Sequence, residues 1–163
     1  MTSGRFRLLL LPAVLGGVLV VNEWGCGGTS AGCVQCPPME GRYALAFGEG
    51  TDPAACASVG VQLPTGPLEV SRAGDALTAQ VEDVTLRGTL YQSYDFTLLG
   101  LGSGGEDGGT RLDAMSFSGR YVPARGDGGV PTLAGNWQAD YSRGAATGVQ
   151  RCAVTRPFTA TRQ

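Results

Sequence analysis

Apolar and polar residues alternate with a period of two over most of the chain from Met39 onward. The first run places Tyr43, Leu45 and Phe47 on one face, with smaller or charged residues between them. Side chains of a strand point alternately to the two faces of its sheet, so this run predicts a half-buried strand. A connection rich in Gly, Asp and Pro follows it at 48–53.

The next runs predict a series of short strands. A glycine-containing turn at 73–75 separates two of them and indicates a hairpin. The alternation slips at 82–83, where we expect a bulge or a short turn. The inward positions predicted in this half of the chain are Leu68, Val70, Leu77, Ala79, Val81, Val84, Leu86, Tyr94, Phe96 and Leu98.

The second half resumes the alternation after a glycine-rich loop at 102–109. Counting back from Met115 places Asp113 on the inward face. Pro157 has no N–H to donate, so we expect the last strand to be an edge strand or to carry a bulge there. The other inward positions are Phe117, Tyr121, Leu133, Trp137, Ala139, Tyr141, Cys152, Val154, Phe158 and Ala160.

A glycine stands between two large apolar residues in three of these segments, 86–90, 117–121 and 133–137. Glycine destabilises a strand interior by about 0.5–1 kcal/mol relative to alanine, so its presence indicates a bend or a close backbone approach. Room for an interior ligand is the alternative explanation. We predict an all-β antiparallel meander of about eight strands, closed or nearly closed into a barrel, with a two-sheet β-sandwich as the alternative.

The Gly135-Asn136-Trp137 triplet resembles the Gly-x-Trp of lipocalins, which are small ligand-carrying barrels. In that family the triplet lies on the first strand, whereas here it lies near the C-terminus, so the resemblance concerns the class of shape. It implies that aromatic residues could line a site for a small apolar ligand. The candidate lining residues are Tyr94, Phe96, Phe117, Tyr121, Trp137 and Tyr141.

The N-terminal segment has the pattern of an export signal. Arg5 and Arg7 precede an apolar run from Leu8 to Val21. At 1.5 Å per residue this run spans only ~21 Å as a helix, less than the ~30 Å of a hydrocarbon core, so a cleaved signal is favoured over a permanent span. We predict a signal peptide at 1–25, a flexible Gly/Cys/Pro-rich tether at 26–40 and a β domain at 41–163.

The end of this segment resembles the lipobox of bacterial lipoproteins. Of the three positions before Cys26, held by Glu23, Trp24 and Gly25, the last agrees with the family pattern. A glycine-rich run at 27–32 follows, as in a membrane tether. The resemblance implies lipidation at Cys26 and anchoring to a membrane of the bacterial envelope. Ordinary cleavage after Gly25 or Gly27, which leaves a soluble periplasmic or secreted protein, is the alternative.

The cysteine count supports the same interpretation. The chain has five cysteines, and assigning Cys26 to a lipid leaves an even set of Cys33, Cys36, Cys56 and Cys152. Four cysteines in an oxidising compartment can form two disulfides, and we favour Cys33 with Cys36 and Cys56 with Cys152. The other two pairings stay open.

The spacing of Cys33 and Cys36 also allows a redox or zinc hypothesis. A thioredoxin-like thiol needs a helix N-terminus, but Pro37 and Pro38 follow at once. A zinc site would need a second closely spaced cysteine pair, which the chain lacks. We therefore expect no metal and no cofactor.

Composition excludes several classes of function. The chain has no histidine, all 12 basic residues are arginine, and the formal charge is −2. Histidine- and lysine-dependent catalysis is therefore excluded, and so is a basic surface for nucleic acid. The carboxylates that could serve an enzyme are Glu82, Asp95, Asp113 and Asp140.

Three classes of function remain. The sequence favours a non-catalytic, membrane-tethered lipoprotein that serves as a structural or binding module. A lipocalin-like carrier of a small apolar ligand is the first alternative, and a carboxylate-based enzyme is the second.

Overall fold

The computed structural model describes residues 32, 33, 35, 36, 38–102, 109–126 and 128–163. The segment predicted as a signal peptide and Cys26 lie outside the described residues. The elements are β1 (Gly41–Phe47), α1 (Ala54–Val59), β2 (Leu68–Ala73), β3 (Ala76–Val81), β4 (Val84–Leu90), β5 (Asp95–Leu101), β6 (Thr110–Val122), β7 (Thr132–Ala145) and β8 (Gly148–Arg162).

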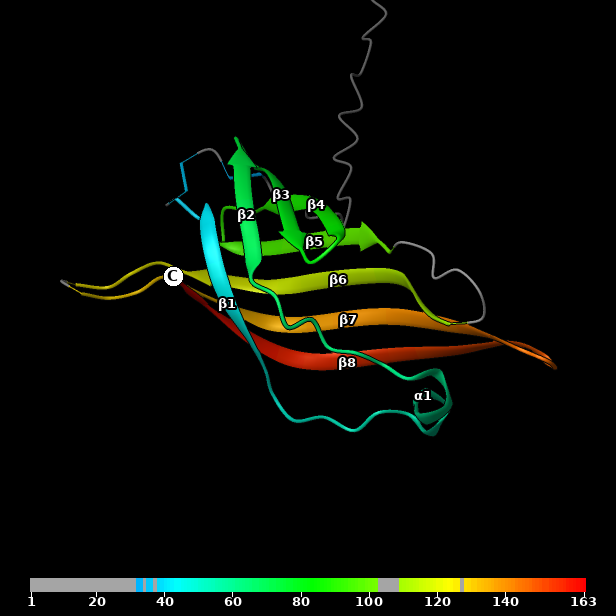
Figure 1. The fold of residues 1–163 in the computed structure, drawn as a ribbon. Coiled ribbons are helices and arrows are strands. Elements are labelled where there is room, and N and C mark those ends of the chain that lie inside the picture. The colour runs from blue at the N-terminus through cyan, green and yellow to red at the C-terminus, as the bar shows by residue number, and fades with distance from the viewer. Residues whose placement is uncertain (1–31, 34, 37, 103–108, 127) are drawn as a thin grey trace, which may run out of the picture.

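All eight strands belong to one antiparallel sheet that closes on itself (Figure 1). Each strand pairs with the next along the chain, and β1 also pairs with β8. The predicted eight-stranded antiparallel meander is thereby confirmed. The alternative of two packed sheets is not what the chain adopts.

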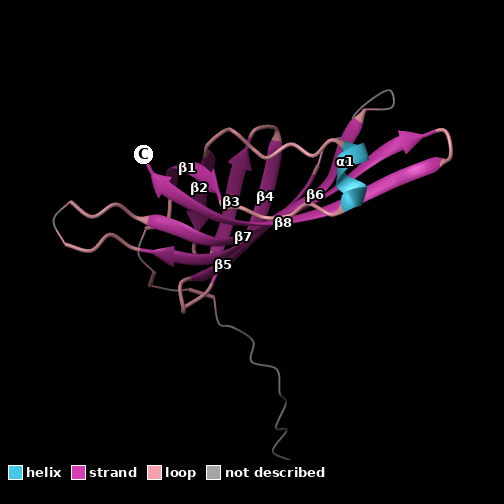
Figure 2. Cartoon of the chain, turned by 90° about the horizontal axis from the view of Figure 1, so that it is seen from below, coloured by secondary structure: helices cyan, strands magenta, loops and turns pink. Residues whose placement is uncertain are grey.

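The ring of pairings is uneven. Strand β7 pairs with β8 along its whole length, whereas β1 and β2 pair only between Gly41–Tyr43 and Leu68–Val70. Strands β6, β7 and β8 therefore extend past the rest of the sheet as a long curved ribbon (Figures 1 and 2). The connection at 48–67, which we call the arm, leaves β1, carries α1 along this ribbon and returns to β2.

The predicted inward residues form a single core. The largest fully buried side chains include Trp137, Tyr43, Tyr121, Phe96 and Phe117, which are at most 2% exposed. Every inward position predicted between Leu68 and Ala160 is buried except Tyr94 and Asp113. The alternation of the sequence thus predicted the core with two errors.

Tyr94 is the first error, because it lies on a turn before β5 and is half-buried. Its φ of 66° is left-handed, and its N–H donates to the carbonyl of Tyr91. A left-handed residue breaks the extended backbone on which a period of two depends.

Asp113 is the second error. The pairing of β6 with β7 shifts its register between Leu112 and Ala114, so Leu112 packs against the core in its place. The carboxylate of Asp113 instead accepts hydrogen bonds from Ser142 and Arg111, both at 3.0 Å. A bulge moves every residue on one side of it to the opposite face, which a strict alternation cannot anticipate.

Two of the recurring glycines lie directly opposite each other, Gly119 on β6 and Gly135 on β7. A Cβ on Gly119 would overlap the carbonyl oxygen of Ala134, and one on Gly135 would overlap that of Ser118. The glycines therefore allow a close approach of neighbouring backbones where the sheet bends.

Pro157 marks the point where β8 loses β1 as a partner on one side, while it stays paired with β7 on the other. Strand β1 pairs with β8 from Phe158 to Arg162, and Gly48 then donates a last hydrogen bond to the carbonyl of Pro157. The C=O and the missing N–H of a residue face the same neighbouring strand. The missing N–H therefore faces the side that β1 leaves, where β8 becomes an edge strand. This agrees with the predicted edge at Pro157.

Helix α1 was not predicted, because six residues are too few to show a helical period. Its signals are nevertheless present, with Pro53 before the helix and Gly60 after it in a left-handed conformation. The buried side chains of the helix are Cys56 and Val59, and α1 packs on β8.

Candidate functional site

One end of the closed sheet is filled by the chain itself. Residues 38–40 and the Cys33–Cys36 disulfide, which we call the plug, pack there. Met39 is fully buried, and the hydroxyls of Tyr43 and Tyr121 donate to the carbonyls of Met39 and Pro38, each at 2.7 Å. This end offers little room for a ligand.

The opposite end, which we call the mouth, is only partly covered by the arm. A cleft of about 470 Å³ remains between the arm, the β3–β4 turn and strands β6 and β7. Its lining residues are Gly60, Gln62, Pro64, Glu82, Asp83, Val84, Thr110, Leu112, Met115 and Tyr141. This volume falls within the range of small-molecule sites, so the mouth cleft is the candidate functional site.

Glu82 positions the return half of the arm at this cleft. It lies in the two-residue turn between β3 and β4, with a left-handed φ of 51°. Its Oε1 accepts hydrogen bonds from the backbone N–H groups of Thr65 and Gly66, at 2.8 and 3.4 Å. The slip in the alternation at 82–83 is therefore a tight turn whose first residue fastens a distant loop.

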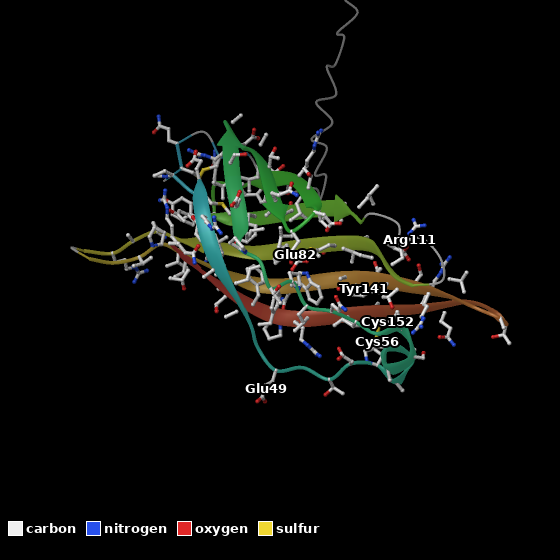
Figure 3. All side chains as sticks on the ribbon, in the orientation of Figure 1. Glu49, Cys56, Glu82, Arg111, Tyr141 and Cys152 are labelled. Carbon is white, nitrogen blue, oxygen red and sulfur yellow. A yellow bond between two sulfur atoms is a disulfide. The ribbon has the colours of Figure 1, made fainter. Side chains whose placement is uncertain are left out.

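Tyr141 fastens the same loop from the other side. Its hydroxyl donates to the carbonyl of Gln62 at 2.6 Å, and the residue, labelled in Figure 3, is only 5% exposed. Burial raises the pKa of Tyr141 to about 12, and the carboxylate of Glu82 adds to the shift. The phenol is therefore neutral at physiological pH and serves as a hydrogen-bond donor.

The outgoing half of the arm is held by a disulfide and by polar contacts. Cys56 on α1 is joined to Cys152 on β8, with their Cα atoms 5.0 Å apart (Figure 3). Thr110 donates to the carbonyl of Val59, and Arg143 donates to that of Ser58 at 3.3 Å. The structure thus forms both favoured disulfides, Cys33–Cys36 and Cys56–Cys152.

The six predicted ligand-lining residues do not lie together, but in three different parts of the structure. Phe96, Phe117, Tyr121 and Trp137 are buried in the core and line none of the clefts described here. Tyr141 lines the mouth cleft, and Tyr94 lines a depression near the plug.

The four candidate carboxylates also separate. Asp113 and Asp140 line one depression of about 350 Å³ together with Arg151. Glu82 lies at the mouth, whereas Asp95 pairs with Arg120 at 3.1 Å at the start of β5. A hydrogen bond from Ser93, together with Arg120, lowers the pKa of Asp95.

Within the described ranges, three or more His, Cys, Asp or Glu side chains nowhere come together as a metal site would require. The described part of the chain contains no helix long and apolar enough to cross a membrane.

Arg156 is a residue that the sequence analysis overlooked. It occupies the inward position between Val154 and Phe158 on β8 and is only 8% exposed. The sequence signal was present, because the alternation of β8 places Arg156 between the apolar inward residues Val154 and Phe158.

Comparison with protein families, curated proteins and solved structures found no match to this chain.

Proposed function

We propose that the chain is an exported, non-catalytic lipoprotein of the bacterial envelope, anchored through Cys26, which displays its β domain as a binding module. The cysteine pairing carries this proposal. Four of the five cysteines are joined in Cys33–Cys36 and Cys56–Cys152, which leaves Cys26 for another role. Two disulfides also suit an oxidising compartment, since they are rare where thiols are kept reduced.

The mouth is the part of the domain that best suits binding. The plug fills the other end, whereas the mouth cleft presents polar groups such as Gln62, Glu82 and Thr110 over an apolar floor that includes Leu112 and Met115. A concave site where several placed polar groups meet a small apolar surface can orient and recognise a ligand.

Intact-mass analysis of the protein from a bacterial host tests the proposal. We expect a mature chain that starts at Cys26, carries a diacyl or triacyl mass increment and retains both disulfides. The Cys26→Ser variant should lose the lipid, whereas a matched double variant, Cys33→Ser with Cys36→Ser, should keep it. A wild-type mass that begins at Gly28 without lipid would contradict the proposal.

A small-ligand carrier is the second candidate, because the mouth cleft is large enough for one. A fluorescent fatty acid titrated into the protein tests it. Saturable binding that is lost in Met115→Trp, which fills the floor of the cleft, would support the carrier. Leu99→Trp is the control, because Leu99 is 60% exposed on β5. Absence of saturable binding to the wild type would exclude a carrier of this ligand class.

A further inference from the structure

The first part of the arm, residues 48–53, crosses the inner face of β8 where β1 has departed, and we call it the strap. At one end of the strap the N–H of Gly48 donates a hydrogen bond to the carbonyl of Pro157. Beyond its other end, Cys56 forms the disulfide with Cys152. Residues 48–53 are themselves exposed to solvent. The strap is therefore fixed at both ends and lightly attached between them.

A buried arginine lies beneath the strap. The Arg156 side chain is only 10% exposed, and its Nη2 donates to Asp52 Oδ1 at 2.7 Å. Its Nη1 is buried and has no hydrogen-bond partner among the described residues. A guanidinium can present two parallel N–H groups to one carboxylate, so the contact with Asp52 uses part of what Arg156 offers.

A second buried donor stands opposite. Trp137 on β7 is the register partner of Arg156 on β8. Its indole Nε1 is also buried without a partner among the described residues. Two donors left unpaired in the interior are costly unless an acceptor reaches them.

The strap has the features of a cover over these donors. Phe47, just before it, packs edge-to-face on Trp137 with ring centroids 5.3 Å apart. A Cβ on Gly50 would overlap Nη1 of Arg156, so a larger residue there would displace the guanidinium from its place beneath the strap. The surface around Arg156 is a depression lined by Gly48, Glu49, Gly50 and Thr51. Glu49 points away from the sheet (Figure 3).

We propose that Arg156 and Trp137 form a carboxylate-binding site, in which Asp52 acts as an internal occupant that a small carboxylate ligand can displace. The ligand's two oxygens would accept from Arg156 and from the Trp137 indole once the strap lifts. A monoanion fits better than a dianion, because one guanidinium balances one negative charge in a largely buried place. This site is separate from the mouth cleft and from the lipid anchor.

The indole N–H signal of Trp137 in a ¹H–¹⁵N NMR spectrum tests the proposal. The full chain with Trp24→Phe keeps Trp137 as its only tryptophan, since the sequence has two. We expect a saturable shift of this signal with sodium acetate and with N-acetylglycine, measured against sodium chloride at equal ionic strength. A larger response to N-acetylglycine would indicate a peptide terminus as the source of the carboxylate.

Three variants sharpen the test. Asp52→Asn removes the internal competitor, and if the strap frees Arg156 in about one molecule in ten, apparent affinity for acetate should rise about tenfold. Gly50→Ala adds a Cβ that crowds Nη1 of Arg156 under the closed strap, so it should also favour the lifted strap and raise the apparent affinity for acetate. Gly144→Ala is its matched control, because a Cβ there meets no atom within 4 Å.

Several outcomes would overturn the proposal. An indole signal that stays unmoved by acetate in both the wild type and Asp52→Asn would mean that water alone serves the two donors. A stronger response to inorganic phosphate than to acetate would exclude the carboxylate class. An apparent affinity for acetate in Gly50→Ala that is no higher than in the wild type would place the binding elsewhere. None of these results depends on lipidation or on the mouth cleft, so the proposed function is tested separately.

Discussion

The two ends of the closed sheet are fastened by the same chemistry and yet differ in what they leave open. At each end a buried tyrosine donates its hydroxyl to a backbone carbonyl of a covering segment, Tyr43 to Met39 and Tyr141 to Gln62. Each end also has a disulfide, but Cys33–Cys36 closes the plug on itself, whereas Cys56–Cys152 ties the arm to β8. The plug nevertheless seals its end, whereas the arm leaves a cleft.

The difference arises from what each segment buries. The plug contributes Met39 and Cys33 to the core, and its Glu40 pairs with Arg72 at 3.0 Å. Burial tends to raise the pKa of Glu40, but a backbone hydrogen bond and Arg72 outweigh it and lower the pKa. The arm is much longer than the plug and yet buries only Cys56, Val59 and Pro64, with Val61 partly buried against the core. A covering segment with few apolar side chains therefore needs point attachments, and the space between them is available for binding.

The largest expected effect concerns the long disulfide. Cys56→Ser with Cys152→Ser removes a closure that spans 96 residues. The loop-entropy model gives up to about 4.7 kcal/mol for a closure of this size, and measured losses are typically 2–5 kcal/mol. We expect urea unfolding to show a loss in this range. A change below about 1 kcal/mol would mean that the polar contacts of the arm suffice without it.

A smaller effect is expected for the plug disulfide. Cys33→Ser with Cys36→Ser opens a bridge of sequence separation 3, for which the same model gives about 2 kcal/mol. The same urea experiment measures it. A loss of stability larger than that of the Cys56 and Cys152 variant would reverse the comparison, because the plug would then depend more on its disulfide than the arm does.

The smallest effect at neutral pH concerns the buried tyrosines, whose contribution to stability changes at high pH. Burial, with a contribution from Tyr121, raises the pKa of Tyr43 to about 12, and the pKa of Tyr141 is likewise raised to about 12. An unfolded tyrosine has a pKa near 10, so the native state holds more protons between about pH 10 and 12. The free energy of unfolding should therefore be unaffected below about pH 10 and should fall as the pH rises toward 12.

The variants Tyr43→Phe and Tyr141→Phe measure separately how much each end of the sheet contributes to the fall in stability between about pH 10 and 12. Each variant should lose about 1 kcal/mol at neutral pH, because a carbonyl loses its donor, and should show a shallower decline above pH 10. Chemical unfolding at a series of pH values measures both quantities. If the free energy of unfolding of both variants falls as steeply as that of the wild type, groups other than these tyrosines cause the loss of stability at high pH.

The fold could be predicted from the sequence because the side chains of a strand point alternately to the core and to solvent, so apolar and polar residues alternate along it. Leu77, Ala79 and Val81 face inward as predicted, and the turn at 82–83 falls where the alternation slips. The alternation failed at Tyr94 and Asp113, where a left-handed residue and a bulge interrupt the extended backbone.

The sites could not be predicted in the same way, because they join residues that are distant in sequence. Tyr141 and Gln62 lie 79 residues apart, and Arg156 and Asp52 lie 104 apart. The sequence could have marked Arg156 as a buried cation from its inward position on β8. Nothing local indicates that Asp52, on an exposed connection, is its partner.

The uneven closure of the sheet has a consequence for how the chain folds. Strands β2 to β8 pair with sequence neighbours, so most of the sheet can form from local hairpins. The pairing of β1 with β8 joins the two ends of the domain, from Tyr43 with Arg162 to Phe47 with Phe158. Contacts of such long sequence separation are slow to form, so we expect this seam to close last. Until it closes, β8 is an open edge, and we expect the order in which the seam closes and Cys152 is oxidised to decide whether the chain reaches its native cysteine pairing.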